Sequence, residues 1–278
     1  MLKVVVTGAG GFVGSRVCQL LSKKKKIKVT ATYNSNKIKI KNTTCKKFNI
    51  YKEKNNFYKF FNKPSILIHL AWPDLDNFNS KNHLKKNLLF QKKFLKNVIK
   101  NGLSNLVVAG TCFEYAKKNG KHSELDKTDP LTSYGKSKNL LRKFLFRLKK
   151  KFKFNLTWVR IFYMYGKNYN RNTLTNLIIN SKRQKKYVLL NKNIKRDFLD
   201  VNEVANRIIL LSQKKKDFGI VNICSGKQLN LKSLVKILKN KYKIQPLVKY
   251  KDMKNRIYEP KNFYGDTSKF NQITKINS

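Results

Sequence analysis

Acidic residues are scarce in this sequence. The chain of 278 residues contains 14 Asp and Glu against 63 Lys and Arg, which gives a formal net charge of +49. Such an excess is typical of proteins that bind nucleic acid or an anionic membrane surface. Here the lysines occupy every segment, those at positions 23–26 and 214–216 included, rather than gathering in one tract. We interpret the charge as compositional drift and expect solvated surface lysines and no specific nucleic-acid partner.

Residues that bind metals or form disulfides are also few. The four cysteines form no Cys-x-x-Cys pair, and the three histidines include no two at ligand spacing. We therefore expect unpaired thiols in a reducing, cytoplasmic compartment and no metal site. No apolar run approaches the roughly 18 residues that a membrane-spanning helix needs. We expect no membrane span.

A glycine-rich turn lies near the start of the chain. The β-branched residues 4–7 lead into glycines at positions 8, 11 and 14, and apolar residues then recur at helical spacing. A strand, a glycine turn and a helix in this order form a dinucleotide-binding fingerprint, because glycine lets the backbone approach a pyrophosphate that the helix N–H groups face. The residues expected to bind the cofactor are Gly8, Gly11, Phe12, Val13 and Gly14.

Short apolar runs alternate with amphipathic helical patterns along the rest of the chain. Strands are predicted at residues 28–33, 46–50, 65–71, 105–109, 156–162, 187–190 and 219–224, and helices at 82–101, 134–149, 172–181, 204–211 and 231–238. This alternation predicts an α/β fold with a doubly wound parallel sheet.

The end of the second predicted strand bears on the choice of cofactor. NAD-binding units usually place Asp or Glu there, on the ribose 2′-hydroxyl, whereas this chain has Asn34, Ser35, Asn36 and Lys37. We predict NADPH rather than NAD, because no carboxylate repels a 2′-phosphate and Lys37 attracts one. Asn49, in the third predicted strand, either contacts the adenine or caps a turn.

Three polar residues form the candidate catalytic set. Thr111 follows the fifth predicted strand, where open α/β sheets place their ligands. Tyr134 and Lys138 lie four residues apart and share one helix face. An ammonium beside a phenol favours the phenolate and lowers the pKa of the tyrosine. Tyr134 is therefore a candidate proton donor or acceptor near neutral pH.

These features occur together in one family. The chain resembles an extended short-chain dehydrogenase/reductase of the NAD-dependent epimerase/dehydratase type, whose members act on nucleotide-linked sugars. The matching segments are residues 7–14, 69–71, 87–88, 110–115, 134–138, 160–166, 196–201, 222–226 and 265–269.

The resemblance implies roles for single residues. Thr111 would hydrogen-bond the sugar oxygen at C4, Tyr134 would exchange its proton, and Lys138 would hold the nicotinamide ribose. The other implied contacts are Leu70, Ala71 and Asn87 at the cofactor, and Phe113, Tyr163, Arg196 and Arg256 at the nucleotide sugar, with Arg196 on its diphosphate.

The resemblance also implies two domains. A dinucleotide-binding Rossmann domain would comprise residues 1–165 and be completed by 193–224, within which residues 196–201 would return to the sheet. Residues 166–192 and 225–278 would form a small substrate-binding lobe. A homodimer would form through the helices at 82–101 and 134–149, although the many basic residues of the second helix oppose a symmetric contact.

Two reactions remain after comparison with the family. Dehydratases carry Asp and Glu after the catalytic threonine, where this chain has Cys112 and Phe113, and 3,5-epimerases need an acid or base in a lobe that here offers no histidine. NADPH-dependent reduction of a nucleotide-linked 4-keto-6-deoxyhexose at C4 is favoured, and 4-epimerisation on retained NAD is the alternative. A non-catalytic RNA-binding protein on the same fold is a further alternative, which filter binding across a salt series would detect.

Overall fold

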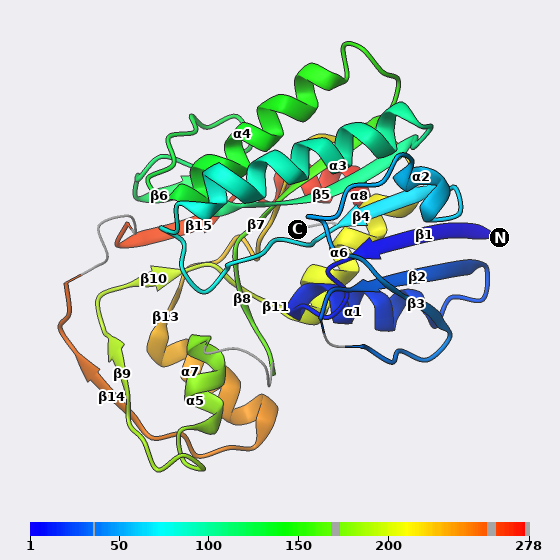
Figure 1. Cartoon of the computed structure of the whole chain (residues 1–278). Coiled ribbons are helices and arrows are strands. Elements are labelled where there is room, and N and C mark those ends of the chain that lie inside the picture. Colours follow the sequence, from blue (N-terminus) through cyan, green and yellow to red (C-terminus); the bar gives the residue numbers. More distant parts are fainter. Residues whose placement is uncertain (36, 168–172, 255–259, 276–278) are drawn as a thin grey trace.

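A seven-stranded parallel sheet forms the centre of the computed structural model, which describes residues 1–275 apart from residue 36 and the segments 168–172 and 255–259 (Figure 1). Every neighbouring pair of these strands is parallel. In spatial order they are β12 (Gly219–Ile223), β7 (Asn155–Ile161), β5 (Asn105–Thr111), β4 (Ile66–His69), β1 (Leu2–Thr7), β2 (Ile27–Tyr33) and β3 (Thr43–Lys47). The predicted doubly wound α/β fold is confirmed.

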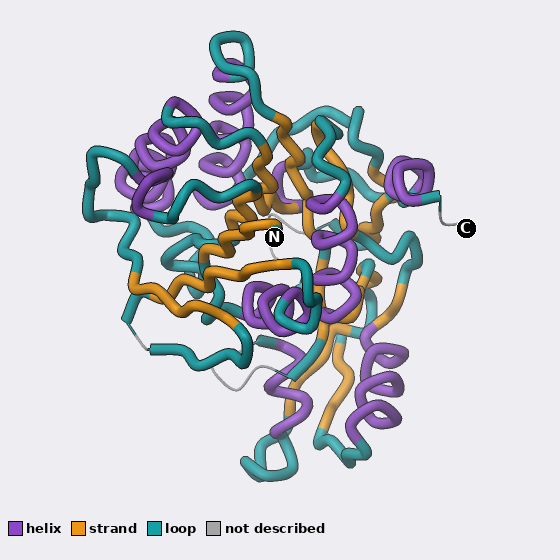
Figure 2. The backbone as a smooth tube through the Cα atoms, turned by 90° about the vertical axis from the view of Figure 1, so that its right-hand side faces the viewer, coloured by secondary structure: helices purple, strands orange, loops and turns teal. Residues whose placement is uncertain are grey.

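Helices cover both faces of this sheet (Figure 2). Successive strand side chains point to opposite faces, so Val4 and Val6 join the core on one face and Val5 joins the core on the other. The first core includes α1 (Phe12–Leu21), α6 (Val201–Gln213) and α8 (Ser268–Thr274). The second includes α2 (Phe57–Phe60), α3 (Leu88–Lys100) and α4 (Ser133–Leu148). Helices α3 and α4 therefore pack on the same face.

Side-chain caps fix where the helices that frame the site begin. The Thr132 hydroxyl accepts a hydrogen bond from the Gly135 N–H (3.0 Å) and starts α4, and the Asp200 carboxylate accepts one from Asn202 (2.8 Å) and starts α6. Each cap satisfies an N–H group that has no partner within its own helix.

Two sequence predictions for the seven-stranded sheet and its helices need correction. The third strand covers residues 43–47 rather than 46–50, because Phe48 and Ile50 turn into the core beside α2 and α3. The helix predicted at 82–101 begins as a π-helix, η1 (His83–Asn87), which continues as α3. The wide π turn buries both His83 and Asn87.

A smaller group of elements extends from the carboxyl end of the sheet (Figure 1). Its apolar cluster joins α5 (Leu174–Asn180), α7 (Leu231–Tyr242) and β9 (Val188–Asn191), and β9 pairs with β14 (Val248–Lys251). A four-stranded sheet follows the order β13 (Leu229–Asn230), β10 (Lys195–Arg196), β15 (Asn262–Gly265) and β6 (Gly120–His122), and β11 (Phe198–Asp200) pairs with β8 (Tyr163–Tyr165).

Residues 196–201 do not return to the seven-stranded sheet, so that prediction is wrong. They contribute to β10 and β11, which lie in two separate small sheets, and to the first residue of α6. The division of the chain into residues 1–165 with 193–224, and 166–192 with 225–278, stays a prediction.

Two lysine runs predicted to lie on the surface do so. Lysines 23–26 and 214–216 are exposed, as predicted. In the described part of the chain, no helix has the length and apolar character to cross a membrane. The same residues contain no group of three metal-ligating side chains close enough to hold an ion.

Candidate active site

The glycine turn after β1 can be built only without side chains at two positions. Gly8 has φ +75°, and a Cβ there would lie 2.8 Å from the backbone nitrogen of Ala71. A Cβ on Gly14 would lie 2.1 Å from the carbonyl oxygen of Gly8. The turn is therefore packed against both the start of α1 and the segment after β4. It brings Leu70 and Ala71, both predicted cofactor residues, beside the glycines.

The N-terminus of α1 fits the pyrophosphate of a dinucleotide. Its N-cap is Gly11, which has extended backbone and no side chain to cover the N–H groups of Phe12, Val13 and Gly14. The first N–H groups of a helix have no partner within the helix, and they carry the positive end of its dipole. An unshielded helix start beside a glycine turn is the arrangement that binds phosphates. The residues present thus fit a nicotinamide dinucleotide and do not distinguish NADPH from NAD.

Gly14→Ala is expected to destabilise the protein by about 1–3 kcal/mol, as overpacking of a tight site does. The new methyl group would collide with the Gly8 carbonyl, so the turn would have to open. Gly10→Ala is the matched control, because a Cβ at Gly10 would make only an ordinary contact with Ile38 at 3.5 Å. Thermal unfolding of the two variants checks the prediction, and equal melting temperatures would contradict it.

The residues predicted to select the cofactor lie at the carboxyl end of the sheet. Asn34 and Lys37 follow β2 and are exposed, while Asn36 lies outside the described residues. The Asn49 side-chain oxygen accepts a hydrogen bond from the Tyr51 N–H (2.9 Å). Asn49 therefore caps a turn, which is one of its two predicted roles; the other, contact with the adenine, stays a prediction.

The three candidate catalytic residues come together where β5 ends. Thr111 is the last residue of β5 and the N-cap of η2 (Cys112–Glu114). Tyr134 and Lys138 lie in the first two turns of α4. A Cβ on Gly135 would lie 2.4 Å from the Phe113 carbonyl oxygen, so the start of α4 packs directly on η2.

Lys138 is buried beneath this junction. Its Nζ donates a hydrogen bond to the Ala109 carbonyl oxygen (2.8 Å) and lies 4.0 Å from the centre of the Trp72 ring and 5.8 Å from that of Tyr134. Burial lowers the pKa of Lys138 from 10.5 to about 7, and the negative charge of Glu114 opposes this shift. Lys138 therefore exchanges a proton near neutral pH.

Aromatic rings surround Tyr134. Phe78 stacks on its ring with centroids 5.2 Å apart, and Trp72 and His83 approach it at 6.0 and 5.4 Å. The Trp72 indole N–H donates to His83 Nδ1 (3.0 Å), and His83 Nε2 contacts the Asn77 carbonyl oxygen (2.9 Å). Because a carbonyl only accepts, His83 carries its proton on Nε2 and holds Trp72 in place.

His69 and Asn87 hold neighbouring segments in place. The buried His69 ring contacts the Thr7 hydroxyl (2.7 Å) and the Gln91 side-chain oxygen, and burial lowers its pKa to about 3. It is a neutral structural residue. The Asn87 side-chain oxygen accepts from the Tyr51 hydroxyl (2.5 Å), and its role toward the cofactor stays a prediction.

A small, partly open hollow lies beside η2. Two predicted substrate residues, Phe113 and Tyr163, line it together with Cys112, Thr132 and Phe263. Cys112 follows Thr111 in the sequence, and Thr132 precedes Tyr134 by two residues, whereas Thr111, Tyr134 and Lys138 are not among the lining residues. This pocket is the candidate site for the sugar.

Of the two arginines predicted to bind the nucleotide sugar, the structure describes Arg196. Arg196 is 1% exposed, and its Nη1 donates to the carbonyl oxygens of Lys195 (2.9 Å) and Lys261 (3.0 Å). Its guanidinium lies 5.5 Å from the centre of the ring of Tyr163, a residue that lines the pocket. Arg256 lies outside the described residues.

Sequence reasoning missed Trp72, Phe78, His83 and Glu114. The three rings reach Tyr134 from the segment between β4 and α3, and no local pattern indicates that packing. Glu114 could have been found, because Thr111 and Glu114 have the spacing of a capping box, the pairing that the structure shows.

Comparisons with known proteins identify the family of this chain. A sequence model of the NAD dependent epimerase/dehydratase family matches residues 4–224. The dTDP-6-deoxy-L-talose 4-dehydrogenase (NAD(+)) of Aggregatibacter actinomycetemcomitans is 30% identical over 208 residues, which cover 72% of this chain and 74% of that protein. An uncharacterized UDP-glucose epimerase of Bacillus subtilis (strain 168), YtcB, is 25% identical over 291 residues, which cover 98% of this chain and 92% of the relative.

The fold has close counterparts among solved structures. The UDP-N-acetylglucosamine 4-epimerase from Methanobrevibacter ruminantium M1, in complex with UDP-N-acetylmuramic acid, superposes with a TM-score of 0.84 at 21% identity. The superposition covers 98% of this chain and 92% of that one. With the family model spanning most of the sequence, the chain belongs to the NAD dependent epimerase/dehydratase family.

Proposed function

We propose that this protein reduces the C4 keto group of a nucleotide-linked 4-keto-6-deoxyhexose with NADPH. The observation that carries the proposal is the hydrogen bond from Lys138 Nζ to the Ala109 carbonyl oxygen (2.8 Å). It ties the helix that bears Tyr134 and Lys138 to the strand that ends in Thr111. A hydroxyl, a phenol and a lysine thereby converge at the carboxyl end of the sheet, where such folds bind ligands.

Each candidate residue has a separate role in the proposed reduction of the C4 ketone. When bound, the nicotinamide supplies the hydride that reaches C4. The Thr111 hydroxyl donates a hydrogen bond to the C4 oxygen, and the Tyr134 phenol gives that oxygen the proton that completes the alcohol. Lys138 stabilises the phenolate left behind until solvent returns a proton. Gly8, Gly11 and the start of α1 hold the pyrophosphate.

The named relatives support chemistry at C4. The Aggregatibacter relative is a 4-dehydrogenase of a nucleotide-linked 6-deoxy sugar, and oxidation at C4 is the reverse of 4-keto reduction. Dehydration is disfavoured, because Cys112 is buried and Phe113 has no ionisable group at the positions where dehydratases place their acid and base. The aromatic wall of the pocket suits a sugar that ends in a methyl group.

A panel of dTDP-, GDP-, UDP- and CDP-linked 4-keto-6-deoxyhexoses tests the proposal. We expect NADPH oxidation that depends on one of these substrates, with a C4 alcohol as the product by NMR. No turnover with any of them, together with inversion at C4 of a hydroxylated nucleotide sugar, would contradict it.

A 4-epimerase with retained NAD is the second candidate, and the Bacillus relative named a UDP-glucose epimerase favours it. An epimerase needs no added cofactor, because its NAD is reduced and reoxidised in each turnover. Purified protein that inverts C4 without external nicotinamide, and that releases NAD on denaturation, would establish this second function.

Cofactor choice gives a further prediction, although the Aggregatibacter relative is named for NAD(+). We expect tighter binding of NADPH than of NADH, and weaker discrimination between the two in Lys37→Glu. Reversing one charge beside a 2′-phosphate is worth about 1–2 kcal/mol at an exposed site, which is roughly 5- to 30-fold in affinity. Fluorescence titration measures both constants.

Lys25→Glu is the control for this titration. Lys25 is equally exposed but precedes β2, at the opposite end of the strand from Lys37. The Lys25→Glu substitution changes the net charge by the same amount as Lys37→Glu and leaves the charge beside the expected 2′-phosphate unaltered. Equal affinities of the wild type for NADPH and NADH, or an equal effect of the two variants, would contradict the prediction.

A further inference from the structure

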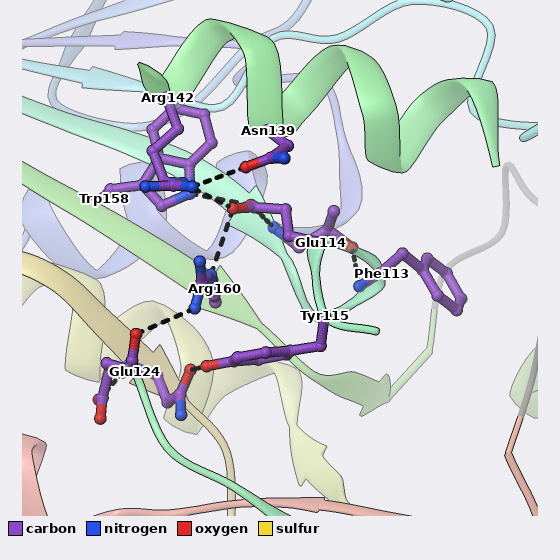
Figure 3. A network of polar contacts seen from close by, with 10 residues as sticks. Phe113, Glu114, Tyr115, Glu124, Asn139, Arg142, Trp158 and Arg160 are labelled. Atoms are coloured by element: carbon purple, nitrogen blue, oxygen red, sulfur yellow. Dashed lines mark hydrogen bonds and ion pairs between the residues drawn. The ribbon is translucent and has the colours of Figure 1, made fainter. Parts of the chain in front are cut away.

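Glu114 lies at the centre of a buried polar network that the proposed reaction does not yet use. Its side chain is 0% exposed, and it ends the short helix η2 that Thr111 caps (Figure 3). A buried carboxylate is costly unless hydrogen bonds and opposite charges surround it. The contacts of its two oxygens show what it connects.

One carboxylate oxygen fixes the backbone at the candidate catalytic threonine. Oε1 accepts hydrogen bonds from the Thr111 N–H (2.9 Å) and from the Trp158 indole N–H (2.9 Å). The Thr111 hydroxyl in turn accepts from the Phe113 N–H (3.3 Å). Gly110 leaves room for this arrangement, because a Cβ there would lie 2.2 Å from the indole nitrogen and 2.6 Å from Oε1.

The other oxygen connects this loop to the helix that carries Tyr134 and Lys138. Oε2 lies 3.2 Å from Arg160 Nε on β7 and 3.4 Å from Arg142 Nε on α4. Arg142 follows Lys138 by one helical turn, and its Nη2 donates to the Asn139 side-chain oxygen (2.7 Å). Figure 3 shows Glu114 between the loop and the arginines.

We propose that Glu114 is a positioning residue for the reduction, holding Thr111 at a fixed distance and orientation from Tyr134 and Lys138. The inference rests on the proposed function. Thr111 and Tyr134 must meet the same sugar oxygen, yet they lie on different elements. Glu114 binds the backbone of the first and, through Arg142, the helix of the second.

The charge of Glu114 has a second effect, which provides an independent readout. The groups that face Lys138 are His69 on β4, His83 on η1, Tyr134 on its own helix and Glu114 on η2. Burial lowers the pKa of both histidines, so they stay neutral near pH 7. Glu114 raises the pKa of Lys138, and removing its charge lowers that pKa further.

Two substitutions of Glu114 separate the effect of its side-chain length from the effect of its charge. Glu114→Asp keeps the charge but withdraws the carboxylate by one methylene group, and a displacement near 1 Å can reduce kcat about 10²-fold. We expect that fall in kcat, with KM for the sugar and Kd for NADPH unchanged. Glu114→Gln keeps the reach and loses the charge, and we expect it to shift the alkaline limb of the kcat profile to lower pH. In Glu114→Asp, which keeps the charge, the alkaline limb of the kcat profile should lie at the same pH as in the wild type.

A control at a second buried carboxylate distinguishes positioning from general loss of stability. Asp197 is also fully buried and accepts from the N–H groups of Ser225 (2.6 Å), Gly226 (2.9 Å) and Gly265 (3.1 Å). Asp197→Asn should lower the melting temperature and leave kcat per folded molecule unchanged. Equal kcat values in Asp197→Asn and both Glu114 variants would overturn the proposal.

Two further measurements keep the test decisive. If Glu114→Asp does not fold, Arg142→Met provides the same test. This variant removes the ion pair between Glu114 and α4 and leaves Glu114 paired with Arg160. Wild-type kcat in Arg142→Met would overturn the proposal. Hydrogen exchange of the Thr111 amide in the protein without substrate should accelerate in Glu114→Asp. Failure of the proposed function appears differently, as a wild-type protein that reduces no 4-keto nucleotide sugar.

Discussion

Replacing Tyr134 by Phe is expected to lower kcat by about 10²- to 10⁴-fold, the usual contribution of a positioned proton donor. The change removes only the hydroxyl, so the stacking on Phe78 (5.2 Å between ring centres) is preserved. Affinity for NADPH should stay close to that of the wild type, since the predicted cofactor contacts are unaltered. Steady-state kinetics on the true substrate and a fluorescence titration measure the two quantities.

Tyr58→Phe is the control for this result. Tyr58 is half-buried on α2 and packs against Gly102 at the end of α3, so it loses the same hydroxyl elsewhere on the same face of the sheet. Its kcat should equal that of the wild type. Near-normal turnover by Tyr134→Phe would show that Tyr134 is not the acid, and the assignment of the catalytic helix would have to be withdrawn.

Lys138→Met is expected to lower both kcat and cofactor affinity, with kcat falling by about 10²- to 10³-fold as when one preorganised donor is lost. Methionine keeps an unbranched chain beneath Trp72, one atom shorter than lysine, but cannot donate to the Ala109 carbonyl oxygen. The loss of affinity distinguishes this variant from Tyr134→Phe. Unchanged affinity would mean that Lys138 does not hold the ribose.

The pH dependence of Lys138 follows from its burial. Its pKa is about 7 in the folded protein instead of 10.5, so the ammonium is present below pH 7 and is lost as the pH rises through that value. Cofactor affinity of the wild type should fall over the same range and be flat in Lys138→Met.

Stability should change with pH in the opposite sense. The unfolded chain binds the proton of Lys138 more tightly, so the wild type should gain stability relative to Lys138→Met between about pH 7 and 10.5. Urea unfolding at several pH values measures this difference, and a constant difference would contradict the burial of a titrating lysine.

The main sheet was predictable because its strands are buried on both faces. Such strands appear in the sequence as continuous apolar runs, and the runs at 105–109 and 219–224 correspond to β5 and β12. The third strand was misplaced because Phe48 and Ile50 extend its apolar pattern, although they pack beside α2 after the strand has ended. Hydrophobic pattern locates a core residue more reliably than the end of a strand.

The small sheets and the surroundings of Tyr134 were not predictable in the same way. Strands β10 and β13 have two residues each, too few to show any alternation. Arg196 was predicted at a diphosphate, and no sequence signal indicates that its Nη1 donates to two backbone carbonyls. The sequence locates Tyr134 and Lys138, but their electrostatic environment depends on residues that only folding brings together.

Helix α8 determines the order in which the chain can complete its fold. Phe270 is 1% exposed within the core that contains α1 and α6, and Lys269 donates to the Ile220 carbonyl oxygen (2.6 Å) on β12. The strands and α6 that this helix covers are synthesised long before it. During translation, the apolar surface of α6 and β12 therefore stays open until residues 268–274 have left the ribosome. A nascent chain of this protein depends on α8 to bury surface that would otherwise favour aggregation.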